Sequence, residues 1–381
     1  MAIEDQGEQG EQKPVREIRI NPIVPTESVL VATARSMRPQ NSEESAPRDT
    51  RKHVDVCPFC RGNEDKTPPQ IARYPQNADP ENENPEDDNP ENENWEMRIV
   101  ENLYPVLGNE RSQPGFNYGL QQAIDGYGRH EVIVDHHQHG IAFHEMSQEH
   151  LSNLFHVYQQ RMKELYKMDK RLKYVLVFKN FGPAAGASMK HTHSQIIATP
   201  VVPQNVHDEV TYSKAYYDRH HHCIFCSLID EALTFEATIY DRASGEVVRK
   251  IDVGQYIVER GEKFIAIKPF ASRYEWEVHI LPLQHKSNYL DTPQEDLDDL
   301  ARVMQRTMAR LDAVIGGAQY NFFLHSLPQG EESQSCHSSY HWHLEICPRT
   351  SIPTGFELGS GLFVNTISPE EAAEQLRSVQ L

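Results

Sequence analysis

The 381-residue sequence has no excess of basic residues: 37 Lys and Arg stand against 56 Asp and Glu, which gives a formal net charge of −19. A chain this acidic repels phosphate backbones and anionic lipid headgroups, so we expect neither nucleic acid nor a membrane as a partner. The sequence also lacks an apolar run long enough to span a bilayer and a segment that resembles a secretory signal. These absences predict a soluble, cytoplasmic protein.

Apolar residues are nearly missing from two segments. The first 13 residues are polar and acidic, and we predict a disordered tail over residues 1–15. Residues 77–94 (NADPENENPEDDNPENEN) contain almost nothing that a core can bury, which predicts a solvated loop inserted into the fold. The remaining chain is long enough for two domains with ordinary cores.

Cysteine is scarce, and four of the six cysteines form two Cys-x-x-Cys pairs, Cys57 with Cys60 and Cys223 with Cys226. Without a secretory signal, such pairs indicate metal or redox chemistry before structural disulfides. The redox interpretation needs a thioredoxin-like context that this sequence does not provide. We therefore favour metal ligation.

The two halves of the chain repeat each other. Glu131–His139 aligns with Glu277–His285 at an offset of 146 residues, and an amphipathic helical pattern follows each segment. The matched apolar positions are Leu151, Leu154, Phe155, Tyr158, Met162 and Leu165 in the first half and Leu297, Leu300, Ala301, Met304, Met308 and Leu311 in the second. The second helix has a start signal, with Thr292 as N-cap and Pro293 as its first residue.

Each half therefore has the same order of features: Cys-x-x-Cys, strand, Gln-His, long helix, strand and His-x-His. This order predicts an α+β fold made of tandem duplicated domains, each a mainly antiparallel sheet with a long helix packed on it. We predict an N-terminal domain over residues 16–212 and a C-terminal domain over residues 213–381. The two halves are expected to pair through their sheets.

Two thiolates and two imidazoles complete a tetrahedral zinc shell, and the repeat supplies two such sets. We predict two structural zinc sites, the second of which could also hold another metal such as iron. The predicted ligands are Cys57, Cys60, His139 and His191 for the first site and Cys223, Cys226, His285 and His341 for the second. Glu209 is a further carboxylate that could reach the second metal.

The segment His191-Thr-His193-Ser-Gln195 follows a glycine-rich loop and precedes an apolar run, so we expect a strand. Alternate residues on a strand share a face, which places His193 and Gln195 together. A neutral histidine can attack phosphorus at cytoplasmic pH, and a neutral amide can donate to phosphoryl oxygens. On this strand a phosphoryl group could therefore meet a nucleophile, a hydrogen-bond donor and a flexible loop together.

Several motifs, in one order along the chain, resemble the galactose-1-phosphate uridylyltransferase family of the histidine-triad superfamily. The matching pieces are Ala34–Arg38, CPFCRGNEDKTPP, Val100–Pro105, Asn180–Gln195 and GFELGSGLFVN at 355–365. The resemblance implies a homodimer, a nucleotide sugar and a hexose 1-phosphate as substrates, and ping-pong transfer through a covalent histidine.

By motif, the resemblance implies that His193 is the catalytic nucleophile and that Gln195 hydrogen-bonds the phosphoryl oxygens. The resemblance implies substrate-binding roles for Arg35, Arg38, Asn102, Asn180, Gly186, Ser188, Glu357 and Asn365. The second half has His343 in the place of His193 but Glu345 in the place of Gln195, and a carboxylate there would repel phosphate. We therefore predict that the second half is a degenerate copy that shapes the pocket.

The sequence also departs from the His-Pro-His-Gly-Gln pattern of bacterial uridylyltransferases, because it has His-Thr-His-Ser-Gln. This version and the Gly-Phe-Glu-x-Gly-x-Gly segment are similar to a plant branch with ADP-glucose phosphorylase activity. Our leading hypothesis is a UDP-glucose–hexose-1-phosphate uridylyltransferase. The alternatives are an ADP-glucose phosphorylase and, from another class, a non-catalytic zinc-stabilised nucleotide-sugar binder.

Overall fold

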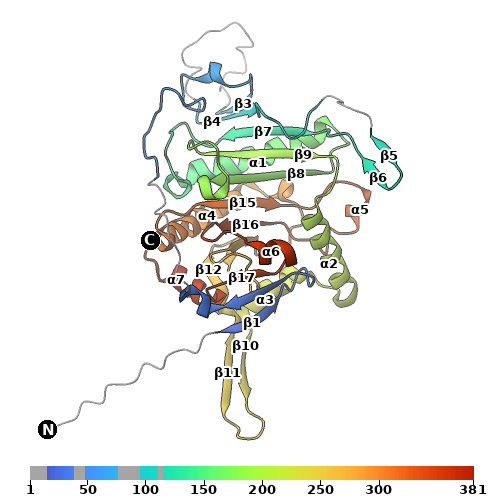
Figure 1. The fold of residues 1–381 in the computed structure, drawn as a ribbon, viewed down its shortest axis with the longest axis vertical. Helices are drawn as coiled ribbons and strands as arrows, with labels where there is room; N and C mark the ends of the chain where they lie inside the picture. The colour runs from blue at the N-terminus through green and yellow to red at the C-terminus, as the bar shows by residue number, and fades with distance from the viewer. Residues whose placement is uncertain (1–14, 38–47, 76–94, 110–114) are drawn as a thin grey trace, which may run out of the picture.

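A computed structural model describes residues 15–37, 48–75, 95–109 and 115–381 of the chain (Figure 1). Three predicted features lie outside the described residues: the acidic insert, Arg38 and all of the predicted tail except Val15. Within the described residues, no helix is both long enough and apolar enough to cross a membrane.

One ten-stranded sheet forms the centre of the molecule, and each of its neighbouring strand pairs is antiparallel. From edge to edge the strands are β12 (Ile257–Arg260), β13 (Phe264–Ile267), β14 (Val278–Pro282), β16 (His343–Pro348), β15 (Tyr320–His325), β8 (Tyr174–Phe181), β9 (His193–Thr199), β7 (Arg129–Val134), β4 (Met97–Glu101) and β3 (Gln70–Tyr74).

The strand order is mirrored about the central β15–β8 pair. Moving outward from β8, the first half runs β9, β7, β4 and β3; moving outward from β15, the second half runs β16, β14, β13 and β12. At the junction, Asn180 of β8 lies opposite Asn321 of β15. The predicted duplication and the predicted pairing of the halves through their sheets are both confirmed.

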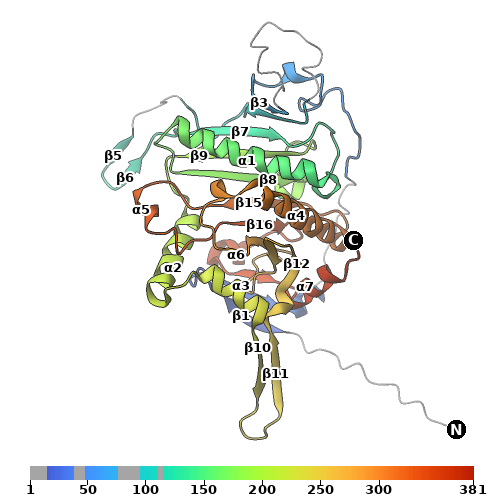
Figure 2. The same cartoon turned by 180° about the vertical axis from the view of Figure 1, so that it is seen from behind.

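The two long helices, α1 (Gln148–Met168) and α4 (Gln294–Ile315), pack side by side on one face of this sheet (Figure 2). Every apolar position predicted for their inner faces is buried. Because each buried Leu, Met or Phe contributes about 1.5–3 kcal/mol, these faces fix both helices on the sheet. The resulting core is continuous across the two halves.

The helix starts differ from each other. Ser147 caps α1 by accepting a hydrogen bond from the backbone N–H of His150. The prediction of Thr292 as the N-cap of α4 is wrong, because the helix begins one residue later and Pro293 is its N-cap. Proline at this position has φ −65° and ψ 157°, an extended conformation that its ring allows as readily as the first helical turn.

Outside the central sheet, α2 (Gln204–His220) and α3 (Ile224–Thr234) follow the first half, and α2 spans the predicted boundary between residues 212 and 213. The amino-terminal and carboxyl-terminal segments form a three-stranded sheet of β1 (Arg16–Ile20), β2 (Ser28–Ala32) and β17 (Phe363–Asn365). The remaining helices are α5 (Glu331–Gln334), α6 (Gly355–Ser360) and α7 (Pro369–Ser378).

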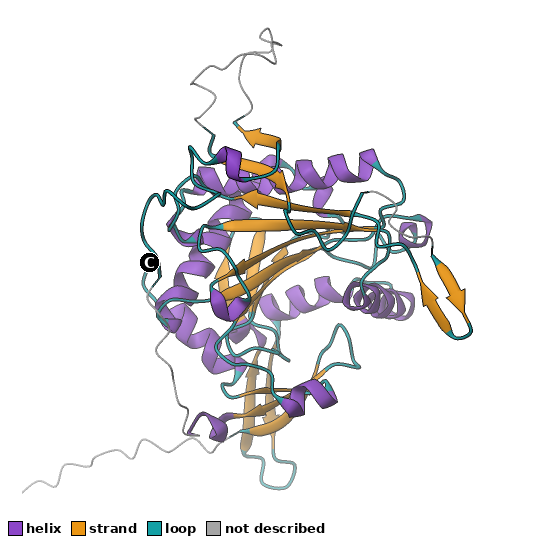
Figure 3. Cartoon of the chain, turned by 45° about the horizontal axis from the view of Figure 1, so that its top comes forward, coloured by secondary structure: helices purple, strands orange, loops and turns teal. Residues whose placement is uncertain are grey.

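Two hairpins extend from the body (Figure 3). One consists of β5 (Phe116–Tyr118) and β6 (Gln121–Ala123), and the other of β10 (Glu236–Tyr240) and β11 (Val247–Asp252). Both are separate two-stranded sheets.

Candidate functional site

His193 is the first residue of β9, and its ring is oriented by the backbone of the segment that leads into the strand. The side chain is 6 % exposed, and its Nδ1–H donates to the carbonyl oxygen of His191 at 2.8 Å. This bond places the lone pair on Nε2, the atom that attacks phosphorus in the predicted reaction. Burial, together with the charge of Lys179, lowers the pKa of His193 and favours the neutral, nucleophilic ring.

Gln195 lies two residues further along β9 and therefore shares a face with His193. Its Oε1 is 2.8 Å from Nε2 of His130, a residue of the neighbouring strand β7. Sequence reasoning missed His130. The signal is the register of β7 and β9, which pairs Val132 with Gln195 and so brings His130 to the same face.

The glycine-rich loop after β8 is anchored by the second half of the chain. Asn321 of β15 donates through Nδ2 to Oδ1 of Asn180 at 2.7 Å and to the carbonyl oxygen of Ala185 at 2.9 Å. Gly182 has φ 85°, and a Cβ at this position would lie 2.5 Å from the side chain of Gln319. The loop thus requires glycine at this position, and the second half holds it in place.

A charged network lies beneath His193, and sequence reasoning missed this network as well. The ammonium group of Lys179, which is fully buried, donates to Asp135 at 2.5 Å, to Thr192 Oγ1 at 2.8 Å and to the carbonyl oxygen of His193 at 2.9 Å. Ser194 Oγ donates to the same Asp135 carboxylate at 3.0 Å. These bonds fix the backbone on both sides of His191–His193.

The other predicted substrate-binding residues of the first half lie in different settings. Asn102 follows β4, and its Nδ2 is 3.1 Å from Nε2 of His130, close to Gln195. Gly186, with φ 81°, and Ser188 are exposed in the loop before β9. Arg35 is exposed on a short 3-10 helix, η1 (Thr33–Met37). Their roles toward a substrate stay predictions.

Glu357 and Asn365 lie on α6 and β17, and their side chains bond to their own surroundings. Glu357 accepts from the backbone N–H and the hydroxyl of Thr354 and so closes a capping box at the start of α6. Asn365 is fully buried, and its Nδ2 donates to the carbonyl oxygen of Ser272 at 3.1 Å. Among the described residues, neither side chain forms a hydrogen bond with His193 or Gln195.

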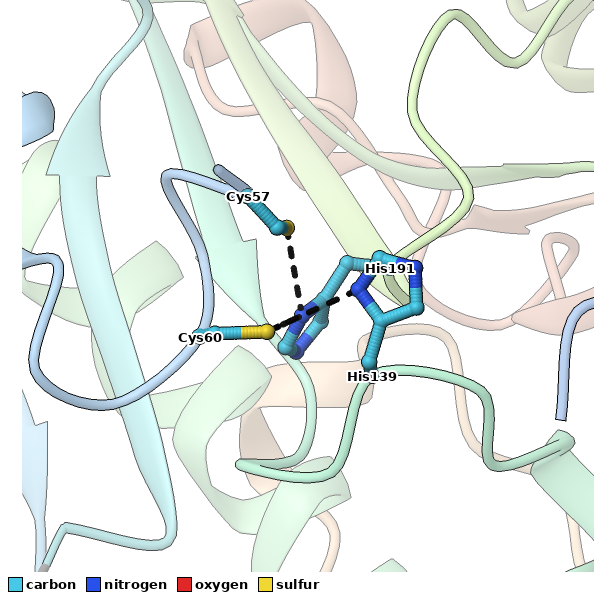
Figure 4. A group of neighbouring side chains, drawn as sticks. All are labelled: Cys57, Cys60, His139 and His191. Carbon is cyan, nitrogen blue, oxygen red and sulfur yellow. Dashed lines mark hydrogen bonds between the residues drawn. The ribbon is translucent and has the colours of Figure 1, made fainter. Parts of the chain in front are cut away.

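The structure brings the four predicted ligands of the first metal site together (Figure 4). Cys60 Sγ is 3.6 Å from Nδ1 of His139 and 3.5 Å from Nδ1 of His191, while Cys57 Sγ is 3.7 Å from Nδ1 of His191. Zn–S bonds of about 2.3 Å and Zn–N bonds of about 2.0 Å in tetrahedral geometry separate S and N by about 3.6 Å. All four residues are buried, and the donor set fits a closed structural zinc site.

The second site repeats this geometry with more exposure. Cys226 Sγ lies 3.4 Å from Nδ1 of His285 and 3.6 Å from Nδ1 of His341, and Cys223 completes the group. The remote nitrogens of both histidines donate to backbone carbonyls, which leaves both Nδ1 atoms free to bind a metal. Here His285 is exposed and Cys226 is half-buried.

Glu209 belongs to a different cluster from the one we expected. It accepts from Nδ1 of His325 at 2.9 Å and from the hydroxyl of Tyr340 at 2.9 Å, and it gathers with His343 and Glu345. A cavity of about 420 Å³ opens beside Glu345 on the second half. The volume of this cavity alone does not indicate a catalytic site, because the second half lacks an amide in the position of Gln195.

Comparison with known proteins agrees with this geometry. The family model for the N-terminal domain of galactose-1-phosphate uridyl transferase matches residues 7–203, which include β9 and the first metal site. The chain belongs to the galactose-1-phosphate uridyl transferase family. The match ends soon after β9, so this family's diagnostic pattern covers the half that carries His193 and Gln195.

Two curated relatives span nearly the whole chain. An ADP-glucose phosphorylase from Arabidopsis thaliana is 28% identical over 96% of this chain and 93% of its own length. A galactose-1-phosphate uridylyltransferase from Thermotoga maritima is 26% identical over 96% and 99%. Among solved structures of the galactose-1-phosphate uridyl transferase fold, an ADP-glucose phosphorylase from Arabidopsis thaliana with bound ADP-glucose matches with a TM-score of 0.76 and 26% identity, covering 96% of this chain and all of the other.

Proposed function

We propose that this protein is a nucleotidyltransferase that acts as a UDP-glucose–hexose-1-phosphate uridylyltransferase through a covalent nucleotidyl–His193 intermediate. The observation that carries the proposal is the hydrogen bond from His193 Nδ1–H to the carbonyl oxygen of His191, which directs a lone pair out of Nε2. Family membership and the neighbouring amide of Gln195 support it.

The chemistry proceeds in two displacements at one phosphorus atom. Nε2 of His193 attacks the α-phosphorus of the nucleotide sugar, a P–N bond forms, and the P–O bond to the β-phosphate breaks to release the hexose 1-phosphate. A phosphate oxygen of the acceptor then attacks the same phosphorus, and the P–N bond breaks to restore neutral His193. Gln195 donates to the non-bridging oxygens as charge develops on them.

A second candidate function is ADP-glucose phosphorylase, in which inorganic phosphate is the acceptor. It is favoured by the 28% identity to a phosphorylase and by the likeness to a structure that binds ADP-glucose. Both functions share the first displacement. They differ in the base of the donor and in whether a sugar phosphate or inorganic phosphate completes the cycle.

We further propose that each chain holds two structural zinc ions, one in each Cys₂His₂ cluster. Support comes from the S···N separations and from the free Nδ1 atoms. When bound, zinc would fix the segment before β9 through His191 and so hold His193 in place. The homodimer and the cytoplasmic location stay predictions.

Intact-mass spectrometry after mixing the protein with UDP-glucose or ADP-glucose, without acceptor, tests the proposal. We expect a uridylyl adduct that galactose 1-phosphate removes and that His193→Ala does not form. An adenylyl adduct removed by inorganic phosphate would establish the phosphorylase instead. Absence of both adducts in metal-loaded protein would favour the non-catalytic binder.

A further inference from the structure

The amide of Gln195 can present either its NH₂ group or its oxygen to a phosphoryl group, and the two orientations have opposite effects. An NH₂ group donates to the developing negative charge, whereas a carbonyl oxygen repels it. The strand alone does not decide between them, because rotating the amide by 180° changes neither its shape nor its packing. A partner in the protein must fix the orientation.

His130 is in the position to do this. Its ring is buried on β7, beside β9, and Nε2 lies 2.8 Å from Oε1 of Gln195. On the other side of the ring, the backbone N–H of Val106 points at Nδ1 at 3.2 Å. A backbone N–H is always a donor, so Nδ1 must be an acceptor and the ring proton must be on Nε2.

The remaining neighbour of this ring, Asn102, points a second donor at Nε2. Asn102 Nδ2 is 3.1 Å from Nε2 of His130, and Asn102 Oδ1 already accepts from the backbone N–H of Tyr104 at 2.9 Å. Asn102 therefore presents no acceptor to the imidazole, and its NH₂ group does not bond to Nε2 when that nitrogen carries the proton. This tautomer still satisfies more neighbours, because it pairs both the N–H of Val106 and Oε1 of Gln195, whereas the other would pair Asn102 alone. The Nε2–H is left to Oε1 of Gln195, which directs the NH₂ group of Gln195 away from His130.

We infer that His130 is a positioning residue that holds Gln195 with its NH₂ group toward the phosphoryl oxygens, and that the N–H of Val106 sets the tautomer this requires. The inference rests on the proposed nucleotidyl transfer and adds a residue to it. A relay of three groups thus connects the exposed loop after β4 with the reacting phosphorus: Val106 N–H, His130 and Gln195.

The test is the single-turnover rate of nucleotidyl–enzyme formation in the metal-loaded protein. His130→Met, which fills the space without a donor, should slow adduct formation about 10- to 100-fold, less than the loss of an oxyanion donor itself. His130→Gln, which can place an N–H near the position of Nε2, should stay within about fivefold of wild type. Val106→Pro removes the backbone N–H that donates to Nδ1 of His130 and should slow the reaction several-fold.

A double-mutant cycle separates positioning from a purely structural role. If His130 acts through Gln195, adding His130→Met to a Gln195→Ala background should change the rate less than about twofold. Full additivity of the two losses would overturn the inference, as would equal rates for wild type and His130→Met. If His130→Met fails to fold, an unchanged rate in Val106→Pro would overturn it instead. A wild-type protein that forms no adduct would remove the proposed function itself, and this inference with it.

Discussion

The two halves of the sheet have corresponding strands in mirrored order and differ in the residues that lie beneath their His-x-His segments. Phe178 pairs with Gln195 in the first half and Phe323 with Glu345 in the second, so Lys179 corresponds to Leu324. The strands of the two halves correspond, yet the buried ammonium group of Lys179 occupies the position that the buried side chain of Leu324 occupies in the second half.

Other polar residues near Lys179 also have apolar counterparts in the second half. Ser194, hydrogen-bonded to the hydroxyl of Tyr158, corresponds to Leu344, and Tyr158 itself corresponds to Met304. Since the second half is fully packed with leucine and methionine there, the fold does not need polar groups at these positions. The difference indicates that the network under His193 serves the proposed site rather than the architecture. Four predictions test how the two halves differ.

The largest effect should separate the two matched histidines. His193→Asn should lower nucleotidyl transfer at least about 10⁴-fold because it removes the nucleophile. His343→Asn, at the matching position, should change the rate only a few-fold, since the second half has no Gln195 equivalent. Turnover assays on both variants decide the matter, and appreciable activity in His193→Asn would contradict the assignment of the active half.

The next largest effect comes from making the first half resemble the second. Gln195→Glu should slow adduct formation by about 10³-fold, because the variant loses the N–H group that donates to the phosphoryl oxygens and gains a negative charge that repels them. The reciprocal Glu345→Gln should not create a second adduct, because Lys179 and Ser194 have only leucines, Leu324 and Leu344, as counterparts there. Two nucleotidyl groups per chain in Glu345→Gln would show that the second half needs only one change to become active.

The buried ion pair allows a stability test. Lys179→Met leaves the Asp135 carboxylate buried without its partner and should lower the free energy of unfolding by about 3–5 kcal/mol. Leu324→Met, its counterpart in the second half, should cost less than about 1.5 kcal/mol. Urea denaturation of the metal-loaded proteins measures both.

A double variant sharpens this test. Adding Asp135→Asn to Lys179→Met removes the stranded charge and should restore much of the stability. We expect slow adduct formation in both the single and the double variant, because each lacks the bonds from Lys179 to Thr192 and to the carbonyl oxygen of His193. Recovery of both stability and rate would mean that the network is structural after all.

The sequence predicted what local patterns determine. The duplicated helices follow from apolar spacing, and both Cys₂His₂ clusters follow from a repeated motif order whose members the fold brings together. It missed His130, Lys179 and Asp135, because their roles arise only when β7 and β8 lie on either side of β9. Along the chain these three residues look like ordinary polar positions in or next to strands. Strand register is a non-local property that periodicity cannot supply.

The smallest predicted effect distinguishes the two metal sites. All four ligands of the first cluster are buried, whereas the second has an exposed His285 and a half-buried Cys226. A chelator should therefore remove one equivalent of zinc roughly tenfold faster than the other, with the second site emptying first. A zinc-release assay with a coloured chelator measures both phases, and Cys226→Ser should abolish the fast phase alone. Loss of the slow phase in that variant would show that exposure does not control release and that the first site, despite its burial, is the labile one.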